Sequence, residues 1–357
     1  MKGVSVVGYR PQFVKAAPLS RALRARTTEV LVHSGQHYDP ELADLFFDEL
    51  GVPQPDHALE VGAGSPLTQL AVMIARLEPL LLDEAPDAVL VYGDTTTTLA
   101  GALAAAKLGL PLAHVEAGLR SFDRSMPEEQ NRVVTDHLSG LLFCPTDGAV
   151  ANLAAEGIRA DVHQVGDVML DASRMFAPAA AARPGPESIG LTRGDYLLVT
   201  VHRAAATDTP EALTALVELL TDIDEPAVFP VHPRTRGKLE AAGLWDRLAA
   251  HAPLHLIPPV GYLDFTALLL GARGVVTDSG GVQKEAYFHG IPCVTLRTTT
   301  EWTETVAGGF NRLVGMDRRL LRDALADLSL PDDRPAYYGD GDAAERIAGA
   351  VAAWSPG

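Results

Sequence analysis

Cysteine is scarce in this chain, with two among 357 residues. Cys144 precedes a proline and Cys293 follows one, each in an apolar stretch, so we expect two buried thiols and no disulfide framework. Long hydrophobic runs are also missing, because the apolar stretches near Leu80 and Leu268 are too short or too interrupted to span a membrane. The N-terminus lacks the layout of a signal peptide. These features predict a cytoplasmic protein with no membrane partner.

Positive charge is in short supply. Lys and Arg number 29 against 46 Asp and Glu, which gives a formal net charge of −17. No stripe of Lys and Arg is present to neutralise a phosphate backbone, so we expect no nucleic acid as partner. A few local cations are enough to hold one small phosphorylated ligand inside an acidic protein.

The length of the chain favours two domains. Short β-branched runs alternate with Ala- and Leu-rich stretches, which is typical of parallel sheets covered by helices on both faces. The predicted strands are 4–8, 29–33, 88–92, 112–116 and 141–145 in one set and 196–201, 227–231, 254–256, 274–277 and 293–296 in another. The predicted helices of the first set are 40–50, 65–84 and 97–108. We therefore predict an α/β protein with two doubly wound Rossmann-like domains facing a cleft, linked through the Pro- and Ala-rich stretch 175–187.

Three carboxylates follow apolar segments in the first half. Asp94 and Glu116 each end a predicted strand, and Glu128 lies at a predicted helix start. Carboxylates at the carboxyl ends of strands are candidates for proton transfer. Simpler interpretations remain open: Asp94 as a helix N-cap, Glu116 paired with Arg120 or Arg132, and Glu128 stabilising the helix dipole. Strand alternation also predicts that His114 and Glu116 share one face.

Arginine, lysine and histidine residues also follow predicted strands. Arg10 and Lys15 follow the first strand after a glycine, where they can hold phosphate oxygens or simply be solvated. His202 follows the opening strand of the second set and is either functional or a partly buried structural histidine.

The stretch Ser279-Gly280-Gly281 is the strongest signal in the second half. Small residues that open a helix leave backbone N–H groups free to approach an anion. Glu285, about one helical turn further on, is placed to take a pair of ribose hydroxyl groups, as acidic residues do in nucleotide-binding folds. The simpler interpretation is an ordinary tight turn.

Taken in order, these motifs resemble the non-hydrolysing UDP-N-acetylglucosamine 2-epimerase family. The resemblance covers nearly the whole chain and includes 8–15, 34–37, 93–95, 114–120, 127–132, 202–203, 232–233, 278–285 and 297–301. It implies a glycosyltransferase-B-type fold with an N-terminal domain over 1–170, a UDP-binding domain over 171–341 and a final helix, 342–357, that crosses back. It also implies a homodimer, a UDP-sugar as the partner, and a place in polysaccharide or glycoside biosynthesis, with neither cofactor nor metal.

Family members are understood to eliminate UDP across C1–C2 of the sugar, giving a 2-acetamidoglucal, and to add it back with C2 protonated from the other face. The resemblance assigns proton handling to Asp94, Glu116 and Glu128, and diphosphate contact to His202. It assigns phosphate contacts to Arg10, Ser279, Gly280 and Gly281, the ribose to Glu285 and the uracil to Phe265. Lys15 matches a motif position within the UDP site, and Arg132, Arg297 and Glu301 are expected near the sugar.

The chain departs from the family pattern after His202-Arg203. Family members usually continue with one residue and then Glu-Asn, where this chain has Ala204-Ala205-Ala206. The similar branch also includes 2-epimerases of UDP-2,3-diacetamido-2,3-dideoxyglucuronate, for which Arg124 is a candidate partner of the uronate. Further alternatives are a hydrolysing epimerase that releases N-acetylmannosamine, a glycosyltransferase of the same fold, and an idle nucleotide-sugar binding protein.

Overall fold

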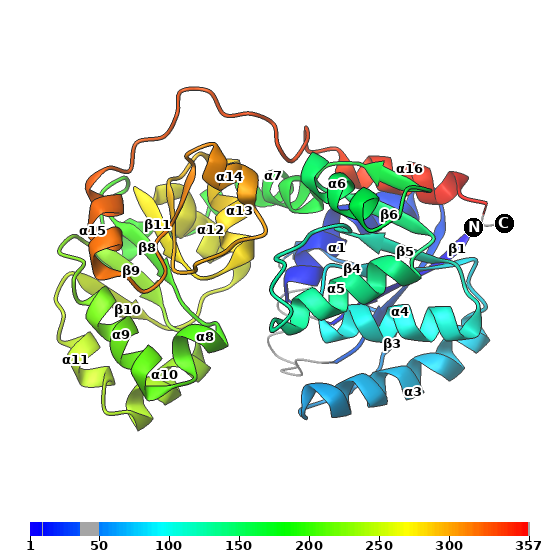
Figure 1. The fold of residues 1–357 in the computed structure, drawn as a ribbon, viewed down its shortest axis with the longest axis horizontal. Helices are drawn as coiled ribbons and strands as arrows, with labels where there is room; N and C mark the ends of the chain where they lie inside the picture. Colours follow the sequence, from blue (N-terminus) through cyan, green and yellow to red (C-terminus); the bar gives the residue numbers. More distant parts are fainter. Residues whose placement is uncertain (9, 36–49, 356–357) are drawn as a thin grey trace. The chain divides into compact units, whose positions relative to one another are not determined.

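Apolar β-branched runs form the strands of two separate parallel sheets (Figure 1). The structure, a computed structural model, describes residues 1–8, 10–35 and 50–355. The chain divides into two compact units: unit 1 comprises Met1–Met175 and Ala336–Gly357, and unit 2 comprises Phe176–Pro335. None of the described helices is long and apolar enough to cross a membrane.

The sheet of unit 1 has, among the described residues, seven parallel strands in the order β3-β2-β1-β4-β5-β6-β7. Its central strands are buried along their whole length, as expected for a sheet covered on both faces. The strands are β1 (Lys2–Val7), β2 (Thr28–His33), β3 (His57–Ala58), β4 (Ala88–Tyr92), β5 (Leu112–Val115), β6 (Leu141–Cys144) and β7 (Val162–Gln164). The chain order reverses between β1 and β4, the point at which ligands bind in such sheets.

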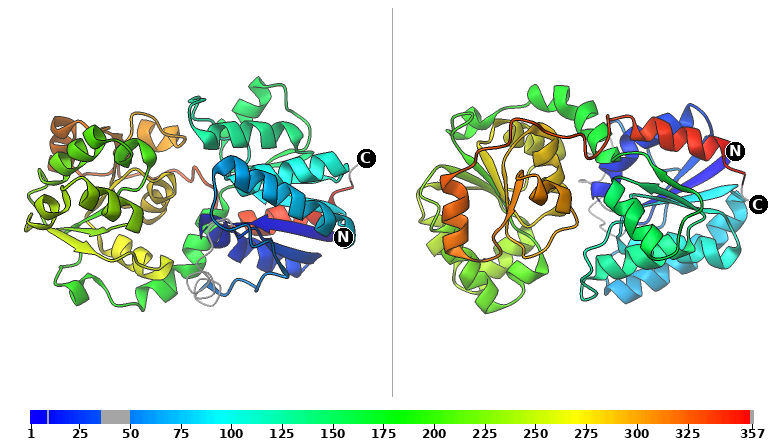
Figure 2. Two further views of the ribbon diagram at one scale, coloured as in Figure 1. Left: turned by 90° about the horizontal axis from the view of Figure 1, so that it is seen from below. Right: turned by 45° about the horizontal axis from the view of Figure 1, so that its top comes forward.

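The helices of unit 1 are α1 (Arg10–Arg24), α3 (Pro66–Glu84), α4 (Thr96–Leu108), α5 (Pro127–Leu138), α6 (Asp147–Ala155), the first part of α7 (Val168–Ala181) and α16 (Ala343–Ala353). Helices α3, α4 and α5 pack side by side. On α16, Ala344, Ile347, Ala348 and Val351 form a buried seam at helical spacing. This last helix packs against α1, and Figure 2 shows the red α16 beside the blue start of the chain.

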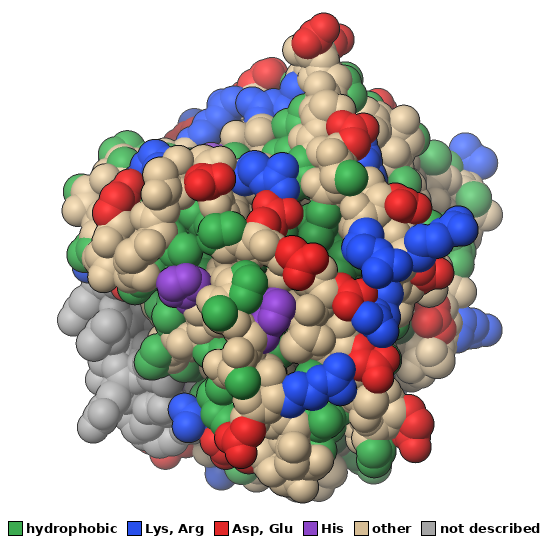
Figure 3. Space-filling view, turned by 90° about the vertical axis from the view of Figure 1, so that its left-hand side faces the viewer, with side chains coloured by type: hydrophobic (Ala, Val, Ile, Leu, Met, Phe, Trp, Pro, Cys, Tyr) green, Lys and Arg blue, Asp and Glu red, His purple; other side chains and the backbone are tan. Residues whose placement is uncertain are grey.

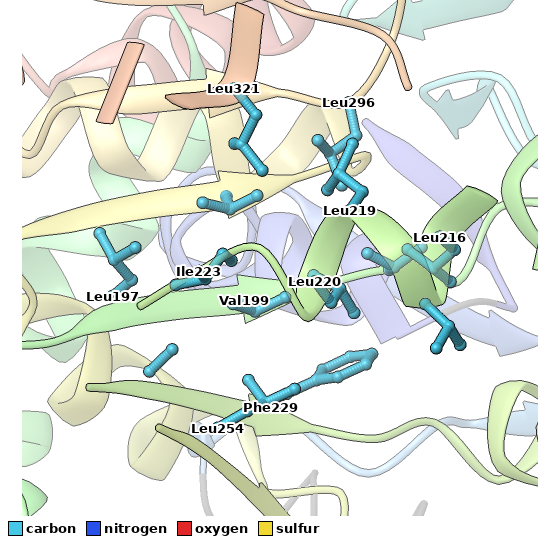
Figure 4. Packing of buried hydrophobic residues seen from close by; sticks show 14 of the residues in the cluster. Leu197, Val199, Leu216, Leu219, Leu220, Ile223, Phe229, Leu254, Leu296 and Leu321 are labelled. Carbon is cyan, nitrogen blue, oxygen red and sulfur yellow. The ribbon is translucent and has the colours of Figure 1, made fainter. Parts of the chain in front are cut away.

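Unit 2 repeats the design with a six-stranded parallel sheet, counted over the described residues, in the order β10-β9-β8-β11-β12-β13. The strands are β8 (Leu197–Thr200), β9 (Ala227–Pro230), β10 (Leu254–Ile257), β11 (Gly274–Thr277), β12 (Cys293–Thr295) and β13 (Asn311–Leu313). One apolar cluster joins strands to helices across a face of this sheet, with Leu197, Val199 and Phe229 meeting Leu216, Leu220 and Leu321 (Figure 4). Burial of such side chains is the main favourable term in folding.

The helices of unit 2 are α8 (Ala204–Thr207), α9 (Pro210–Leu220), α10 (Pro233–Ala241), α11 (Trp245–Ala249), α12 (Tyr262–Gly271), α13 (Gly280–His289), α14 (Thr303–Ala307) and α15 (Arg318–Ala326), with a 3₁₀ turn η1 (Pro186–Ile189). Figure 3 shows basic and acidic side chains interspersed on one face of the molecule. Surface pairs of this kind in unit 2 include Arg234 with Asp208 and Arg318 with Asp222. Each such exposed pair adds little to stability.

The structure confirms the predicted α/β class with two parallel sheets, and Cys144 and Cys293 are buried and unpaired. The boundary between the two units, after Met175, falls at the start of the predicted linker 175–187, and α7 continues across it to Ala181 through Pro178. Alanine is the strongest helix former, and this composition favours helix over an extended linker. The predicted helix 40–50 lies, except for its last residue, outside the described part of the chain.

Candidate active site

In unit 1, Gly93 follows strand β4 and forms a hydrogen bond to the end of the neighbouring strand β5. Its N–H donates to the carbonyl of Val115 at 2.9 Å, and its backbone is left-handed, with φ of +62°. A Cβ atom here would lie 3.2 Å from Oε2 of Glu116 and 3.2 Å from Nζ of Lys15. The left-handed conformation favours glycine, and any other residue would crowd these two charged groups.

Glu116 pairs with Lys15, which extends from α1. Of the two partners considered from the sequence, Arg120 pairs with Asp136 and Arg132 pairs with Asp94. Glu116 itself has a φ of +72°, an unusual conformation for a residue with a side chain and one found often at functional sites. The strand ends at Val115, so the alternation that predicted a face shared with His114 does not extend to Glu116.

The Lys15–Glu116 pair lines a small depression in unit 1. Apolar side chains form most of its remaining wall, among them Phe143, Val168 and Ile347. Charges act more strongly next to such a wall than in open water, because the local dielectric constant is lower. The ion pair with Lys15 holds the Glu116 carboxylate in a defined position beside this wall.

Asp94 pairs with Arg132 of α5, and the carbonyl of Asp94 accepts from Asn131 Nδ2 at 2.9 Å. The helix N-cap is the next residue, Thr95, whose side chain accepts from the N–H of Thr98. The capping interpretation of Asp94 was therefore wrong. The carboxylate is left at the sheet edge, partly exposed and held by a guanidinium group.

The two neighbouring glutamates of α5 occupy different environments. Glu129 is buried and accepts from the N–H groups of Ser121 and Phe122 and from Arg132 Nη1 at 2.8–3.0 Å. Glu128 is partly exposed and makes no hydrogen bond or ion pair with any residue that the structure describes. Glu129 thus holds the preceding loop and Arg132, whereas Glu128 keeps its acceptor atoms available.

In unit 2, the loop that carries His202 is fastened by Asp278. The buried carboxylate of Asp278 accepts from the N–H of His202 at 3.0 Å and from that of Arg203 at 2.8 Å. Its other oxygen lies 3.5 Å from Nδ1 of His202, whose side chain is 49% exposed. The loop is therefore anchored by two backbone hydrogen bonds.

Ser279 follows Asp278 and caps helix α13, accepting from the N–H of Val282. The first N–H groups of a helix have no partner within it, so those of Gly280 and Gly281 lie at an anion-binding position. A Cβ atom on Gly280 would lie 3.9 Å from Arg297 Nη1 and 3.8 Å from Glu301 Oε2. Arg297 and Glu301 form a two-bonded ion pair of 3.0 and 3.1 Å. The structure thus brings these predicted residues together with the glycine turn.

Glu285 is buried on α13 and accepts a hydrogen bond from the hydroxyl of Tyr262. Burial and the nearby carboxylate together raise the pKa of Tyr262 far above its ordinary value. Tyr262 opens helix α12, which also carries the partly buried Phe265. Glu285 therefore contacts, through Tyr262, the same helix that carries Phe265.

One predicted residue is described only in part. Arg10 begins helix α1, but its side chain, like the whole of Tyr9 and Gln36, lies outside the described residues. Among the residues that are described, no three His, Cys, Asp or Glu side chains gather in a group that can hold a metal ion.

Comparison with known proteins identifies the family. The model of the UDP-N-acetylglucosamine 2-epimerase family matches residues 21–352. The chain belongs to this family. It is 46% identical to a UDP-N-acetylglucosamine 2-epimerase homologue of Methanococcus maripaludis over 97% of this chain and 98% of that one. It is also 46% identical to the UDP-2,3-diacetamido-2,3-dideoxy-D-glucuronate 2-epimerase of Pseudomonas aeruginosa, over 98% of each chain.

A solved structure from the epimerase family has the same fold. The crystal structure of the Methanocaldococcus jannaschii UDP-GlcNAc 2-epimerase, in complex with UDP-GlcNAc and UDP, aligns with a TM-score of 0.92. The alignment covers 98% of this chain and 99% of that one at 41% identity. These matches confirm the resemblance drawn from the motifs.

Sequence reasoning missed the residues that hold the predicted ones in place. Asp278 was noted only as the start of a motif, and Glu129 only as an acid in the first turn of a helix. His114 and Asp136, both fully buried, were not assigned a partner. The available signal was a polar residue within an otherwise apolar strand or helix face, because such a residue needs a hydrogen-bond partner.

Proposed function

We propose that the protein is a UDP-N-acetylglucosamine 2-epimerase that interconverts UDP-GlcNAc and UDP-ManNAc. One observation carries the proposal: unit 1 presents three carboxylates at one end of its sheet, two of them paired with Lys15 and Arg132 and one, Glu128, without a partner in the described chain. Inversion at C2 needs one group to remove a proton and another to deliver one to the opposite face. Carboxylates in different surroundings can differ in proton affinity, so one of them can act as the base that removes the proton and another as the acid that delivers it.

The reaction balances without an external reagent. A carboxylate removes the C2 proton, the C–H electron pair forms the C1=C2 bond, and the C1–O bond breaks with its electrons leaving on UDP. In the return step, a phosphate oxygen of UDP bonds to C1 while an acid protonates C2 on the other face. We assign the proton transfers to Asp94, Glu116 and Glu128. Lys15 and Arg132 hold the carboxylates of Glu116 and Asp94 in place through their ion pairs.

We assign most contacts with the nucleotide part of the substrate to residues of unit 2. The N–H groups of Gly280 and Gly281 and the hydroxyl of Ser279 hold the diphosphate at the start of α13. His202, partly exposed and fastened through Asp278, assists the departing phosphate, and Glu285 takes the ribose hydroxyls. UDP has to stay bound between the two steps, because free UDP would leave the glycal behind.

The 2,3-diacetamido glucuronate is the second candidate substrate, since one relative of 46% identity is named for it. A carboxylate at C6 of the sugar requires a cation. Arg124 lies exposed in the loop before α5 and is the side chain that we assign to this role.

Proton NMR of the protein with UDP-GlcNAc in D₂O tests the proposal. We expect the manno epimer to accumulate with deuterium at C2, because the acid that protonates C2 exchanges with solvent. Release of free UDP with N-acetylmannosamine would identify a hydrolysing enzyme. If UDP-GlcNAc stays intact without exchange, the same experiment with the diacetamido glucuronate decides between the second substrate and a binding protein.

A further inference from the structure

Both ring nitrogen atoms of His114, a fully buried residue of β5, face hydrogen-bond acceptors. Nε2 lies 2.7 Å from the carbonyl oxygen of Gly93, and Nδ1 lies 2.7 Å from Oδ1 of Asp136. A carbonyl oxygen can only accept, so Nε2 carries a hydrogen atom. A neutral imidazole has only one N–H group. If the ring were neutral, Nδ1 would present its lone pair to a carboxylate oxygen.

Asp136 is held as a carboxylate by donors other than His114. Its Oδ2 atom accepts from Arg120 Nη1 at 2.6 Å and from the N–H of Gly118 at 3.1 Å. Burial alone would raise the pKa of Asp136, but hydrogen bonds and charge from His114 and Arg120 outweigh it, so the pKa lies below its ordinary value. An ionised acceptor at 2.7 Å from Nδ1 therefore requires a second ring hydrogen.

The charge balance of the surrounding cluster points the same way. Arg120 also binds Glu156 through two hydrogen bonds of 2.6 and 2.8 Å. Asp136 and Glu156 bring two negative charges against the single positive charge of Arg120. A protonated His114 makes these four groups neutral overall. A neutral ring leaves one net negative charge, part of it on Glu156, which is partly exposed to water and also lies 3.7 Å from Nδ1 of His137.

The hydrogen bonds of this cluster end at two turns of the candidate site. His114 holds the carbonyl of Gly93, the residue between β4 and Asp94. Asp136 holds the N–H of Gly118, two residues after Glu116. The pair therefore fixes the backbone on both sides of the two carboxylates without itself belonging to the set of residues that handle the C2 proton.

We propose that His114 is a positioning residue held permanently as the imidazolium, and that its bond to Gly93 sets the place of Asp94 beside Glu116. The positioning part of this inference rests on the proposed function, whereas the charge state of the ring does not. The two parts are therefore tested by different measurements.

NMR of protein labelled with ¹⁵N-histidine reads the protonation of each ring nitrogen, and a His114→Gln variant assigns the signal. At pH 8 we expect both nitrogens of His114 to carry hydrogen. A neutral tautomer of His114 at pH 8 would overturn the proposal. This result is decisive even if no variant folds or the protein proves to have another activity.

Two substitutions separate the hydrogen bonds. The amide nitrogen of Gln takes the place of Nε2 and can still donate to Gly93, whereas that of Asn takes the place of Nδ1 and can donate only to Asp136. We expect His114→Asn to lower kcat by about 100-fold, the cost of a small misplacement of a catalytic group. His114→Gln should lose about tenfold or less, with KM and the Kd for UDP little changed in both.

His137→Gln is the matched control, because His137 is on the same helix as Asp136 and is partly exposed. It should keep the kcat of the unaltered protein. If folded His114→Asn also keeps that kcat, His114 has a structural role only and the positioning proposal is wrong. If the unaltered protein turns over neither UDP-sugar, the proposed function fails, and the NMR result still decides the charge state.

Discussion

The sheets of the two units share the order of six strands, to which unit 1 adds β7, and they differ in the groups at the carboxyl ends of their strands. In unit 1, the edge carries ion pairs, Lys15 with Glu116 and Arg132 with Asp94. In unit 2, it carries backbone N–H groups, because Asp278 fastens the His202 loop and the next residues are Ser279 and two glycines. The same scaffold is thus fitted for moving protons in one unit and for holding an anion in the other.

The largest effect is expected from Glu116→Gln in unit 1. The amide cannot transfer a proton and loses the charge that attracts Lys15, so turnover should fall by about 10²- to 10⁴-fold. The affinity for UDP, measured by titration calorimetry, should stay within about twofold, because most of the assigned nucleotide contacts come from unit 2.

Glu78→Gln, exposed on α3, serves as control and should match the unaltered protein. A loss of UDP affinity equal to the loss of turnover would show that Glu116 belongs to the nucleotide site, and the division of labour between the units would fail.

Asp171 gives the next largest effect, on the stability of unit 1. It accepts from the N–H groups of Ala343 and Ala344 at the start of α16, and burial, together with the charges of Asp167 and Asp342, raises its pKa to about 6. The folded state then favours the protonated acid, so stability present at low pH is lost as the pH rises from about 4 to 6.

Asp171→Asn removes this penalty. Relative to the unaltered protein, its free energy of unfolding should be higher by about 1.5 kcal/mol at pH 5 and about 3 kcal/mol at pH 8. Denaturant unfolding at the two pH values measures this. A variant less stable at pH 8 would mean that the ionised Asp171 stabilises the helix through its dipole.

The smallest effect is expected from Gly280→Ala in unit 2. The added methyl group meets no atom closer than 3.4 Å, so the fold should tolerate it. It partly covers the N–H groups at the start of α13, and UDP binding should weaken by about tenfold, or 1.4 kcal/mol. Gly349→Ala on α16, where the methyl group meets nothing within 4 Å, is the control and should leave UDP binding unchanged.

The central strands and the helices α3, α4 and α16 could be predicted from sequence because their apolar runs are continuous or periodic. The edge strands β3, β7 and β13 have only two or three residues, and the polar residues of β7 are exposed, so no apolar run indicates them. Cys144, at the end of the buried strand β6, belongs to the predictable part.

The candidate carboxylates could also be predicted, but their partners could not. Lys15 lies far from Glu116 in sequence, and no local pattern sets which cation meets which acid. The left-handed backbone conformation of Glu116 could not be predicted from the sequence either, because residues other than glycine rarely adopt it and no local pattern indicates it. Both features depend on how β4, β5, α1 and α5 meet in three dimensions.

The packing of α16 against α1 has a consequence for the order in which the chain is made. A ribosome completes all of unit 2 before it reaches residue 343, so unit 2 has every residue it needs while unit 1 still lacks one of its helices. Domains generally fold as whole units during synthesis. Unit 1 is therefore started first and completed last. Its helix α1 has no α16 to pack against until the last residues of the chain have been synthesised.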